Sequence, residues 1–497
     1  MIIPEREENR LTVPRAPTRA SVGRGVLWSA GGGAASKGAA LIAFLLIARE
    51  LDPDAFGLVA LASLFITILS VFVEQGFPQA LVQRQSIDDV HLSTAFWANV
   101  CISATLAVII VLAAAPISAA FSEPGLAVVL KVLSLSLVLG AFSGVQVAIL
   151  QRHMRFGVLA TRSFAGTAVG GLVGVALALT GFGVWALVAQ TLVVQAVTAV
   201  ALWMSTGWSP RAVFSFDRLR ELWSFGVNVL GSRLVNLANI RTAHIMIALV
   251  LDKRALGLYS VAAQIEGALS GLLINTVTRV SLATLSRFQG NLPMFRRVYF
   301  AGVRLTAAFG VPAFVGVAAL APDITVCFLG PQWTEAAPIV SILALLGVVS
   351  SVGAFNVTAI ASLGFPRYNF QLDALNAAFT VCAIAVALPW GLTGVAFAFV
   401  ARAYLLWPVR FLVLRRLCGV TFRELGASLW GIVVSAGAMA ALITWMRGFD
   451  LGFGAWSKLA GLTVVGALSY AACLAVLSPS TLREGMRLGR ASITTAH

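Results

Sequence analysis

The sequence predicts an all-α polytopic membrane protein with about fourteen transmembrane helices, forming two parallel-related six-helix bundles plus two C-terminal helices. Three observations lead to this prediction: the composition, a series of long apolar runs, and an internal repeat. Hydrophobic residues make up 59% of the 497 residues and charged residues only 11%, whereas soluble domains carry about 25% charged residues. The mean hydropathy of +0.91 agrees with a chain that lies mostly in a bilayer.

The apolar runs give the number of spans. A bilayer core about 30 Å thick requires roughly 20 apolar residues per helix. The first run is too long for the apolar part of a cleavable signal, so we count it as a span. The fourteen expected spans lie near residues 25–48, 56–75, 92–115, 126–150, 158–180, 183–204, 222–250, 256–283, 298–320, 337–361, 367–388, 390–412, 425–445 and 456–477.

The internal repeat relates residues 47–62 to residues 247–262. Eight of the sixteen ungapped positions are identical, among them Asp52 and Asp252 in the turn and Gly57 and Gly257 after it. Weaker matches follow in the same order: 121–131 with 329–338, and 181–187 with 391–397. A repeat of this kind predicts two related halves.

Each half contains an even number of spans, so both halves enter the membrane from the same side and the repeat is parallel. Two related halves of membrane helices are typical of transporters. The expected divisions are a disordered cytoplasmic tail (1–24), an N-terminal six-helix bundle (25–204), a cytoplasmic linker (205–221), a C-terminal six-helix bundle (222–412), two additional helices (413–477) and a second cytoplasmic tail (478–497).

The basic residues give the orientation. With both termini in the cytoplasm, cytoplasmic segments hold 23 of the 35 Lys and Arg residues, Arg162 among them, and outside segments hold five. This asymmetry is the positive-inside rule, and it explains most of the net charge of +15 without nucleic acid as a partner. The five cysteines form no CxxC or Cys/His cluster, so no metal site, disulfide framework or cofactor is expected.

Several segments resemble one family of membrane transporters. Residues 49–57, 75–84, 93–99, 150–156 and 181–187 are similar, in this order, to bacterial polysaccharide repeat-unit flippases, particularly the colanic-acid-exporter type. These proteins are part of the multidrug/oligosaccharidyl-lipid/polysaccharide exporter superfamily. The resemblance covers roughly residues 25–480. It implies alternating-access transport of undecaprenyl-diphosphate-linked oligosaccharide across the bacterial inner membrane, for surface polysaccharide such as exopolysaccharide or O-antigen.

Cations inside the spans are candidates for holding the diphosphate. A charge near the bilayer centre costs at least about 2.5–3.5 kcal/mol and therefore needs a partner or an aqueous cavity. Arginine suits phosphate because its planar fork donates two parallel hydrogen bonds. We expect Lys37, Arg233, Arg241 and Arg304 to contact the head group, with Lys37 and Arg233 first. The alternative for Arg304, and for Lys131, Arg279 and Arg402, is that the side chain reaches an interface or pairs locally.

Polar side chains recur at helical spacing in four spans and are expected to line a wet cavity. These stripes are Ser63, Thr67, Ser70 and Glu74 in the second span, Arg233, Asn236, Ile240 and His244 in the seventh, Tyr259, Glu266 and Ser270 in the eighth, and Asn369, Asp373, Asn376 and Thr380 in the eleventh. Glu266 and Asp373 are candidates for coupling a proton or cation, the alternative being that each neutralises a nearby arginine. His244 is read more readily as a hydrogen-bonded packing residue than as a proton relay. The remaining expected cavity-lining residues are Glu74, Asn236, His244, Asn369 and Asn376.

Two other functions remain open. One is a cation-coupled multidrug or small-molecule exporter, which the excess of basic over acidic residues inside the spans disfavours. The other is a membrane-embedded polysaccharide polymerase or glycosyltransferase, disfavoured because the expected outside loops are short and carry no acidic metal motif. The leading prediction is a transporter, not an enzyme. Its expected partners are lipid-linked oligosaccharide, membrane lipids and the polymerase or export machinery of the polysaccharide.

Overall fold

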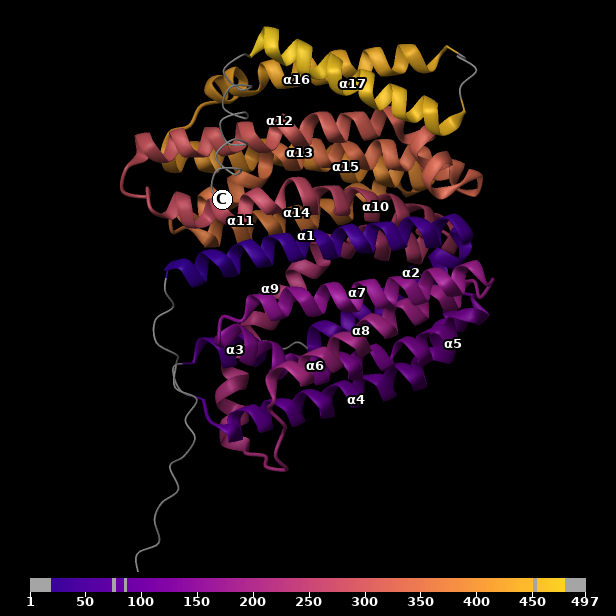
Figure 1. Cartoon of the computed structure of the whole chain (residues 1–497), viewed down its shortest axis with the longest axis vertical. Coiled ribbons are helices and arrows are strands. Elements are labelled where there is room, and N and C mark those ends of the chain that lie inside the picture. Colours follow the sequence, from indigo (N-terminus) through magenta and orange to yellow (C-terminus); the bar gives the residue numbers. More distant parts are fainter. Residues whose placement is uncertain (1–18, 74–76, 85–86, 450–453, 479–497) are drawn as a thin grey trace, which may run out of the picture. The chain divides into compact units, whose positions relative to one another are not determined.

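The computed structural model describes residues 19–73, 77–84, 87–449 and 454–478; along parts of α1, α9 and α11 it describes the backbone alone. Every regular element in these ranges is helical. The chain divides into two compact units, Met1–Arg241 (unit 1) and Thr242–His497 (unit 2), and α9 contributes residues to both (Figure 1).

The helices up to and including α9, which crosses that division, are α1 (Arg19–Glu50), α2 (Pro53–Val73), α3 (Phe77–Gln83), α4 (Asp89–Ala120), α5 (Pro124–Leu133), α6 (Leu135–Arg152), α7 (Phe156–Leu179), α8 (Val184–Thr206) and α9 (Phe216–Val250). Those that follow are α10 (Lys253–Leu273), α11 (Asn275–Ser286), α12 (Leu292–Ile324), the π-helix η1 (Thr325–Leu329), the 3₁₀ helix η2 (Pro331–Ala336), α13 (Ala337–Ser362), α14 (Pro366–Ala387), the 3₁₀ helix η3 (Leu388–Trp390), α15 (Gly391–Cys418), α16 (Phe422–Arg447) and α17 (Ala455–Leu477).

The expected spans coincide with these helices. Among the described residues, eleven helical segments are long and apolar enough to cross a membrane, and one of them, Pro366–Cys418, contains both α14 and α15. The all-α polytopic fold predicted from the sequence is therefore confirmed. Two expected spans are each divided into two helices: 126–150 at Ser134, between α5 and α6, and 256–283 at Ile274, between α10 and α11.

The repeated stretch adopts the same local structure in both units. The carboxylate of Asp52 accepts a hydrogen bond from the backbone N–H of Ala55 at 2.7 Å, and Asp252 accepts one from Ala255 at 2.7 Å. The preceding helix ends alike in both copies, since the N–H of Leu51 donates to the carbonyl of Ile47 at 3.1 Å and that of Leu251 to Ile247 at 2.9 Å. Each aspartate thus caps the N-terminus of the helix that follows, α2 or α10.

In unit 1, α7 packs closely against both α1 and α8 (Figure 1). Glycines at a spacing of four residues, Gly166, Gly170 and Gly174, lie on the face of α7 that meets α8. Side chains as small as these let helix backbones approach, a recurring device in membrane helix pairs. α7 and α8 are therefore held at a short separation, and both helices supply walls of the cavity described below.

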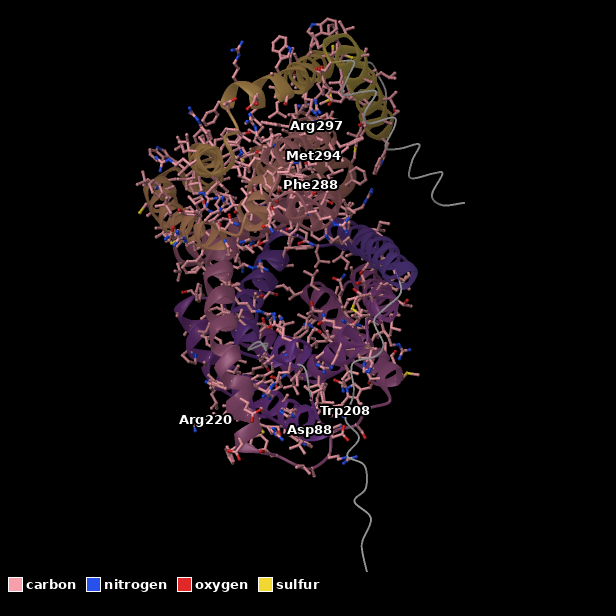
Figure 2. All side chains as sticks on the ribbon, turned by 90° about the vertical axis from the view of Figure 1, so that its left-hand side faces the viewer. Asp88, Trp208, Arg220, Phe288, Met294 and Arg297 are labelled. Atoms are coloured by element: carbon pink, nitrogen blue, oxygen red, sulfur yellow. The ribbon has the colours of Figure 1, made fainter. Side chains whose placement is uncertain are left out.

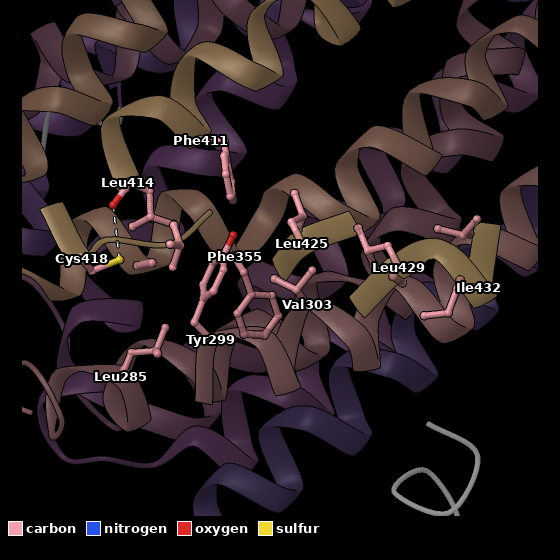
Figure 3. Packing of buried hydrophobic residues seen from close by; sticks show 14 of the residues in the cluster. Leu285, Tyr299, Val303, Phe355, Phe411, Leu414, Cys418, Leu425, Leu429 and Ile432 are labelled. Atoms are coloured by element: carbon pink, nitrogen blue, oxygen red, sulfur yellow. Dashed lines mark hydrogen bonds between the residues drawn. The ribbon is translucent and has the colours of Figure 1, made fainter. Parts of the chain in front are cut away.

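In unit 2, a core cluster of eighteen buried residues lies among α11, α12, α13, α15, α16 and α17. Tyr299, Phe355 and Phe411 are almost completely buried in this cluster (Figure 3). The Tyr299 hydroxyl donates to the side-chain oxygen of Asn356 at 2.6 Å. The thiol of Cys418 donates to the carbonyl of Leu414 at 3.3 Å. Because α16 and α17 pack on α12, the two additional helices are part of the packed core of unit 2.

The connection between α8 and α9 is tied to the start of α4. The indole N–H of Trp97 donates to the carbonyl of Arg211 at 2.8 Å, and the hydroxyl of Ser93 accepts from the backbone N–H of Arg211 at 3.1 Å. Figure 2 labels Asp88, Trp208 and Arg220, which lie in this region at the lower end of the view. The connecting segment is thereby part of unit 1.

Candidate functional site

Unit 1 contains a cavity of about 540 Å³, called here the unit 1 cavity. Among the described residues, its two charged lining residues are arginines, Arg162 from α7 and Arg233 from α9, and none of its described lining residues is acidic. The polar stripe predicted on the second span, Ser63, Thr67 and Ser70 of α2, faces this cavity. The other lining side chains with hydroxyl or amide groups are Gln79, Asn99, Ser136, Ser143, Gln151, Thr191, Gln195 and Thr198.

Arg162 is the residue of this cavity that the sequence interpretation missed, because it was counted in a cytoplasmic loop. The structure places it in the second turn of α7, where its Nε atom is buried without a hydrogen-bond partner among the described residues. A buried guanidinium donor without an acceptor is costly. An anionic ligand in the cavity would supply the acceptor, so Arg162 joins Arg233 as a candidate anion contact.

Unit 2 contains a second polar cavity, of about 480 Å³, called the unit 2 cavity. Its charged lining residues are Glu266 from α10 and Arg402 and Arg410 from α15; Ser270, Ser350 and Asn376 also line it. A carboxylate oxygen of Glu266 accepts a hydrogen bond from the Ser270 hydroxyl at 2.6 Å. The unit 2 cavity therefore combines charges of both signs, unlike the unit 1 cavity.

The polar face of α14 is distributed around the unit 2 cavity. Asp373 forms an ion pair with Arg410, with 2.5 Å between the carboxylate oxygen and Nη2. Asn369 donates to the backbone carbonyl of Val357 at 2.9 Å, and Asn376 lines the cavity. Asp373 therefore has the arginine partner that the sequence interpretation gave as its alternative role.

Arg402 occupies an unusual position because its side chain is only 6% exposed. Its Nη1 atom donates to the Thr380 hydroxyl and, at 3.4 Å, to the Asn376 carbonyl, and its guanidinium lies 4.5 Å from the centre of the Phe399 ring. Its Nε atom is buried with no acceptor among the described residues. Of the two alternatives left open for Arg402, local pairing agrees with these contacts, but the pairing leaves one donor unsatisfied.

The other predicted residues lie in several environments. Lys37 is half-buried on α1, Arg304 lies on α12, and Arg241 is on α9 at the last position of unit 1. His244 packs edge-on against the buried Tyr259 ring, with 5.0 Å between ring centres. Glu74 and the Asn236 side chain lie outside the described residues. The structure thus brings Arg233 into the unit 1 cavity and Glu266 and Asn376 into the unit 2 cavity.

The predicted stripe on the seventh span does not share one environment. Arg233 lines the unit 1 cavity and His244 packs on Tyr259, whereas Ile240 between them is 58% exposed. The divide between the two units falls in this same stretch of α9. Helical periodicity predicts that these residues share one face of a straight helix. It does not predict which unit each part of that face contacts.

Outside the spans, a charged cluster joins the α3–α4 connection of unit 1 to the start of α9. Arg84 pairs with Glu221 at 2.5 Å, and the His91 ring bonds both Asp88, at 2.6 Å, and Arg84, at 2.8 Å. The hydrogen bond from Arg84 holds the pKa of Glu221 below its usual range. For Asp88, burial raises the pKa, but hydrogen bonds from His91 outweigh it and the net shift is downward.

These features define a class. Helices of this number, with a repeated turn, form the fold of solved exporters: the structure titled "Lipid II flippase MurJ, inward closed conformation" superposes with a TM-score of 0.75 at 14% identity, covering 93% of this chain and 99% of that one. An inward-facing multidrug resistance MATE transporter superposes with a TM-score of 0.55 at 17% identity, covering 79% and 94%. The protein is therefore a multi-pass membrane protein with the fold of these exporters.

Within that class the family is also clear. Residues 46–338 match the model of a family described as "Polysaccharide biosynthesis protein", and the chain belongs to this family. The succinoglycan biosynthesis transport protein ExoT of Rhizobium meliloti is 28% identical over 65% of this chain and 66% of its own length. The teichuronic acid biosynthesis protein TuaB of Bacillus subtilis is 24% identical over 56% and 58%, and the lipopolysaccharide biosynthesis protein WzxC of Escherichia coli is 22% identical over 66% and 67%. The matching region thus spans about two thirds or less of the length of these relatives.

Proposed function

We propose that this protein is an inner-membrane flippase that moves undecaprenyl-diphosphate-linked oligosaccharide repeat units across the membrane by alternating access, for surface polysaccharide synthesis. The observation that supports the proposal most directly is the unit 1 cavity, whose described lining side chains include two arginines and no acidic residue. The positive charge of such a cavity attracts an anionic ligand, and no described carboxylate in its wall opposes that attraction. The family and the named roles of the relatives agree with this substrate class.

The proposed contacts follow from the chemistry of the substrate. The diphosphate contacts Lys37, Arg233, Arg241 and Arg304, because guanidinium and ammonium groups are the side chains that bind phosphate as charge-assisted donors. Arg162 joins this set. The sugars bear many hydroxyl groups, which pair with the hydroxyl and amide side chains of the unit 1 cavity. No covalent step is required, so binding and conformational change suffice.

We further propose that Glu266 and Asp373 couple transport to a proton or a cation. Glu266 faces the unit 2 cavity, and Asp373 lies beside Arg410, which lines the same cavity. Protonation of Asp373 would release the charge of Arg410 into the cavity. Both chain termini face the cytoplasm in this proposal, as the distribution of basic residues predicts.

Deletion of the gene in its host tests the function. We expect lipid-linked repeat units to accumulate on the cytoplasmic face of the inner membrane and surface polysaccharide to fall. The measurement is the amount of lipid-linked intermediate accessible to a glycosidase in intact and in inverted vesicles. Unchanged surface polysaccharide, in a strain from which redundant transporters have also been removed, would refute the flippase assignment.

Substitution of two cations tests the contacts. We expect Lys37→Ala and Arg233→Ala proteins to insert and fold but to transport at least tenfold less, since a hydrogen bond to a charged group contributes about 1.5–3 kcal/mol. The matched control is Lys131→Ala, which removes an exposed cation from α5. Wild-type transport by both test variants would contradict the assignment of these two residues.

A drug-exporter function is distinguished by the sign of the substrate charge. The fold is shared with multidrug transporters, but a cavity lined by arginines without carboxylates repels cationic drugs. In proteoliposomes we expect no gradient-driven transport of ethidium. Robust ethidium export would favour that second function.

A further inference from the structure

An apolar groove runs over α14 and α15 on the surface of unit 2. It has a volume of about 670 Å³, and of the fourteen residues that line it only Arg402 is charged. Its walls include large exposed side chains: Phe379 and Val386 from α14, and Phe397 and Leu405 from α15. A surface groove of this composition, on a membrane helix pair, fits a hydrocarbon chain.

The groove meets the unit 2 cavity at a single charged residue. Arg402 lines both, and so does Leu406 one turn further along α15. The groove is apolar, whereas the cavity contains Glu266, Ser270 and Asn376. Arg402 therefore stands where an apolar site ends and a polar site begins, the same division that exists within a lipid between its tail and its head.

Arg402 also retains binding capacity at this point. It is only 6% exposed, its Nη1 atom is bonded, and its Nε atom has no acceptor within the described parts of the chain. No ion pair to a carboxylate is present for Arg402 among the described residues. A phosphate oxygen would satisfy the free donor and balance the charge.

The position of Arg402 along α15 indicates which kind of lipid could bring a phosphate to it. It lies eleven residues after the start of α15 at Gly391 and sixteen before the end at Cys418, which at about 1.5 Å per residue is roughly 17 Å and 24 Å from the two ends. Arg402 is therefore well inside the span. A resident phospholipid keeps its phosphate outside the hydrocarbon core, which is about 30 Å thick, whereas a lipid whose head group is being moved across the membrane brings its phosphate into that core.

We propose that the groove over α14 and α15 holds the prenyl chain of the transported lipid while its diphosphate binds Arg402 from the side of the unit 2 cavity. This inference rests on the proposed function and adds a path for the tail and a further head-group contact. The tail stays in an apolar environment throughout, so only the head group and the sugars need a polar route.

Site-specific photocrosslinking tests the proposal. The full-length protein carries the photoreactive residue p-benzoylphenylalanine at position Leu405 in the groove, which is 74% exposed, or at Leu468 of α17 as a control, which is 65% exposed. Each protein is placed in nanodiscs of phosphatidylglycerol with a small fraction of undecaprenyl diphosphate. Mass spectrometry then counts the lipid adducts at each position. We expect undecaprenyl diphosphate to be enriched about tenfold over its mole fraction at 405 and not at 468. Adducts at 405 in proportion to the mole fractions would overturn the proposal, because the groove would then hold ordinary lipid.

Two variants separate the role of Arg402 from a structural one. We expect Arg402→Gln to abolish the enrichment at 405 and Arg402→Lys to retain part of it. Ala401→Trp fills the groove beside Arg402 from its open side, and we expect it to abolish the enrichment even if Arg402→Gln fails to fold. The control is Ala438→Trp on an exposed face of α16, which should leave the enrichment unchanged. Enrichment that survives Ala401→Trp would refute the groove as the site.

The result is independent of the flippase test. Wild-type protein is also assayed for translocation of a fluorescent undecaprenyl diphosphate sugar in proteoliposomes. Translocation without enrichment at 405 would overturn the tail path alone, and enrichment without translocation would overturn the flippase function while the lipid site remained.

Discussion

The close contact between α7 and α8 gives a prediction whose size follows from the structure. A methyl group added at Gly170 would overlap Cγ2 of Val194 and lie 3.0 Å from both the carbonyl oxygen of Gln190 and the backbone nitrogen of Val194. Backbone atoms cannot rotate away as a flexible side chain can. In the Gly170→Ala variant the two helices must therefore separate.

The magnitude combines two opposing effects. Alanine favours the helix over glycine by about 1 kcal/mol, and overpacking costs about 1–3 kcal/mol. Because the nearest atoms include backbone, we take the upper figure and expect a net loss of about 2 kcal/mol. For a unit of this size that lowers the thermal midpoint by about 4–8 °C. Transport should fall as well, since α7 and α8 carry Arg162 and Gln195 in the wall of the unit 1 cavity.

The assay is thermal unfolding of the purified protein in detergent, monitored by size-exclusion chromatography with fluorescence. The control is Gly437→Ala on α16, where an added methyl meets nothing within 4 Å, so the midpoint should stay constant or rise. Equal midpoints for the two variants would refute the packing argument.

Three further predictions concern other parts of the chain. Asp52→Ala and Asp252→Ala should each destabilise by about 1 kcal/mol, because each removes an equivalent helix cap; calorimetry showing no loss for either would contradict the cap. Lowering the pH from 6 to well below 4.5, the ordinary pKa of a glutamate, should reduce the thermal stability of wild-type protein more than that of Glu221→Gln. A carboxyl with a lowered pKa stabilises the fold above its unfolded pKa and loses that contribution as the pH falls through its folded pKa. Parallel pH profiles would exclude a role for the Arg84–Glu221 pair. Arg162→Gln should weaken binding of undecaprenyl diphosphate about tenfold without loss of folding, measured by native mass spectrometry; unchanged binding would remove Arg162 from the site.

The fold was predictable because one physical requirement dominates it. A bilayer leaves each spanning segment little choice except an apolar helix, so counting apolar runs located the spans. The divisions at Ser134 and Ile274 escaped that count, because each falls inside a run that was long enough to be counted as one span. The turn at Asp52 and Asp252 was visible because a short capping side chain has a sequence signature.

The site was harder to predict because a span boundary uncertain by one turn changes the role of a charge. Arg162 lies near the start of α7 and was counted as a loop residue, yet its Nε atom is buried at the unit 1 cavity. Arg402 was recognised as an intramembrane charge, but sequence cannot show that one side chain borders both a groove and a cavity. Which charges approach each other, as Arg410 and Asp373 do, depends on helix rotation, which helical periodicity constrains only within a single helix.

The two units share the same turn, but their cavities differ in charge. This difference makes the two units unequal in how they would hold an anion. The charged residues that line the unit 1 cavity within the described parts of the chain are both arginines, while Glu266 lines the unit 2 cavity together with two arginines. A chain assembled from two copies of unit 1 would contain two cavities whose described charged residues are all arginines. Such a chain would hold an anion without a neighbouring carboxylate of the kind that Glu266 supplies in unit 2. Asymmetry between duplicated halves is therefore what would let such a scaffold both capture and release the same charged cargo.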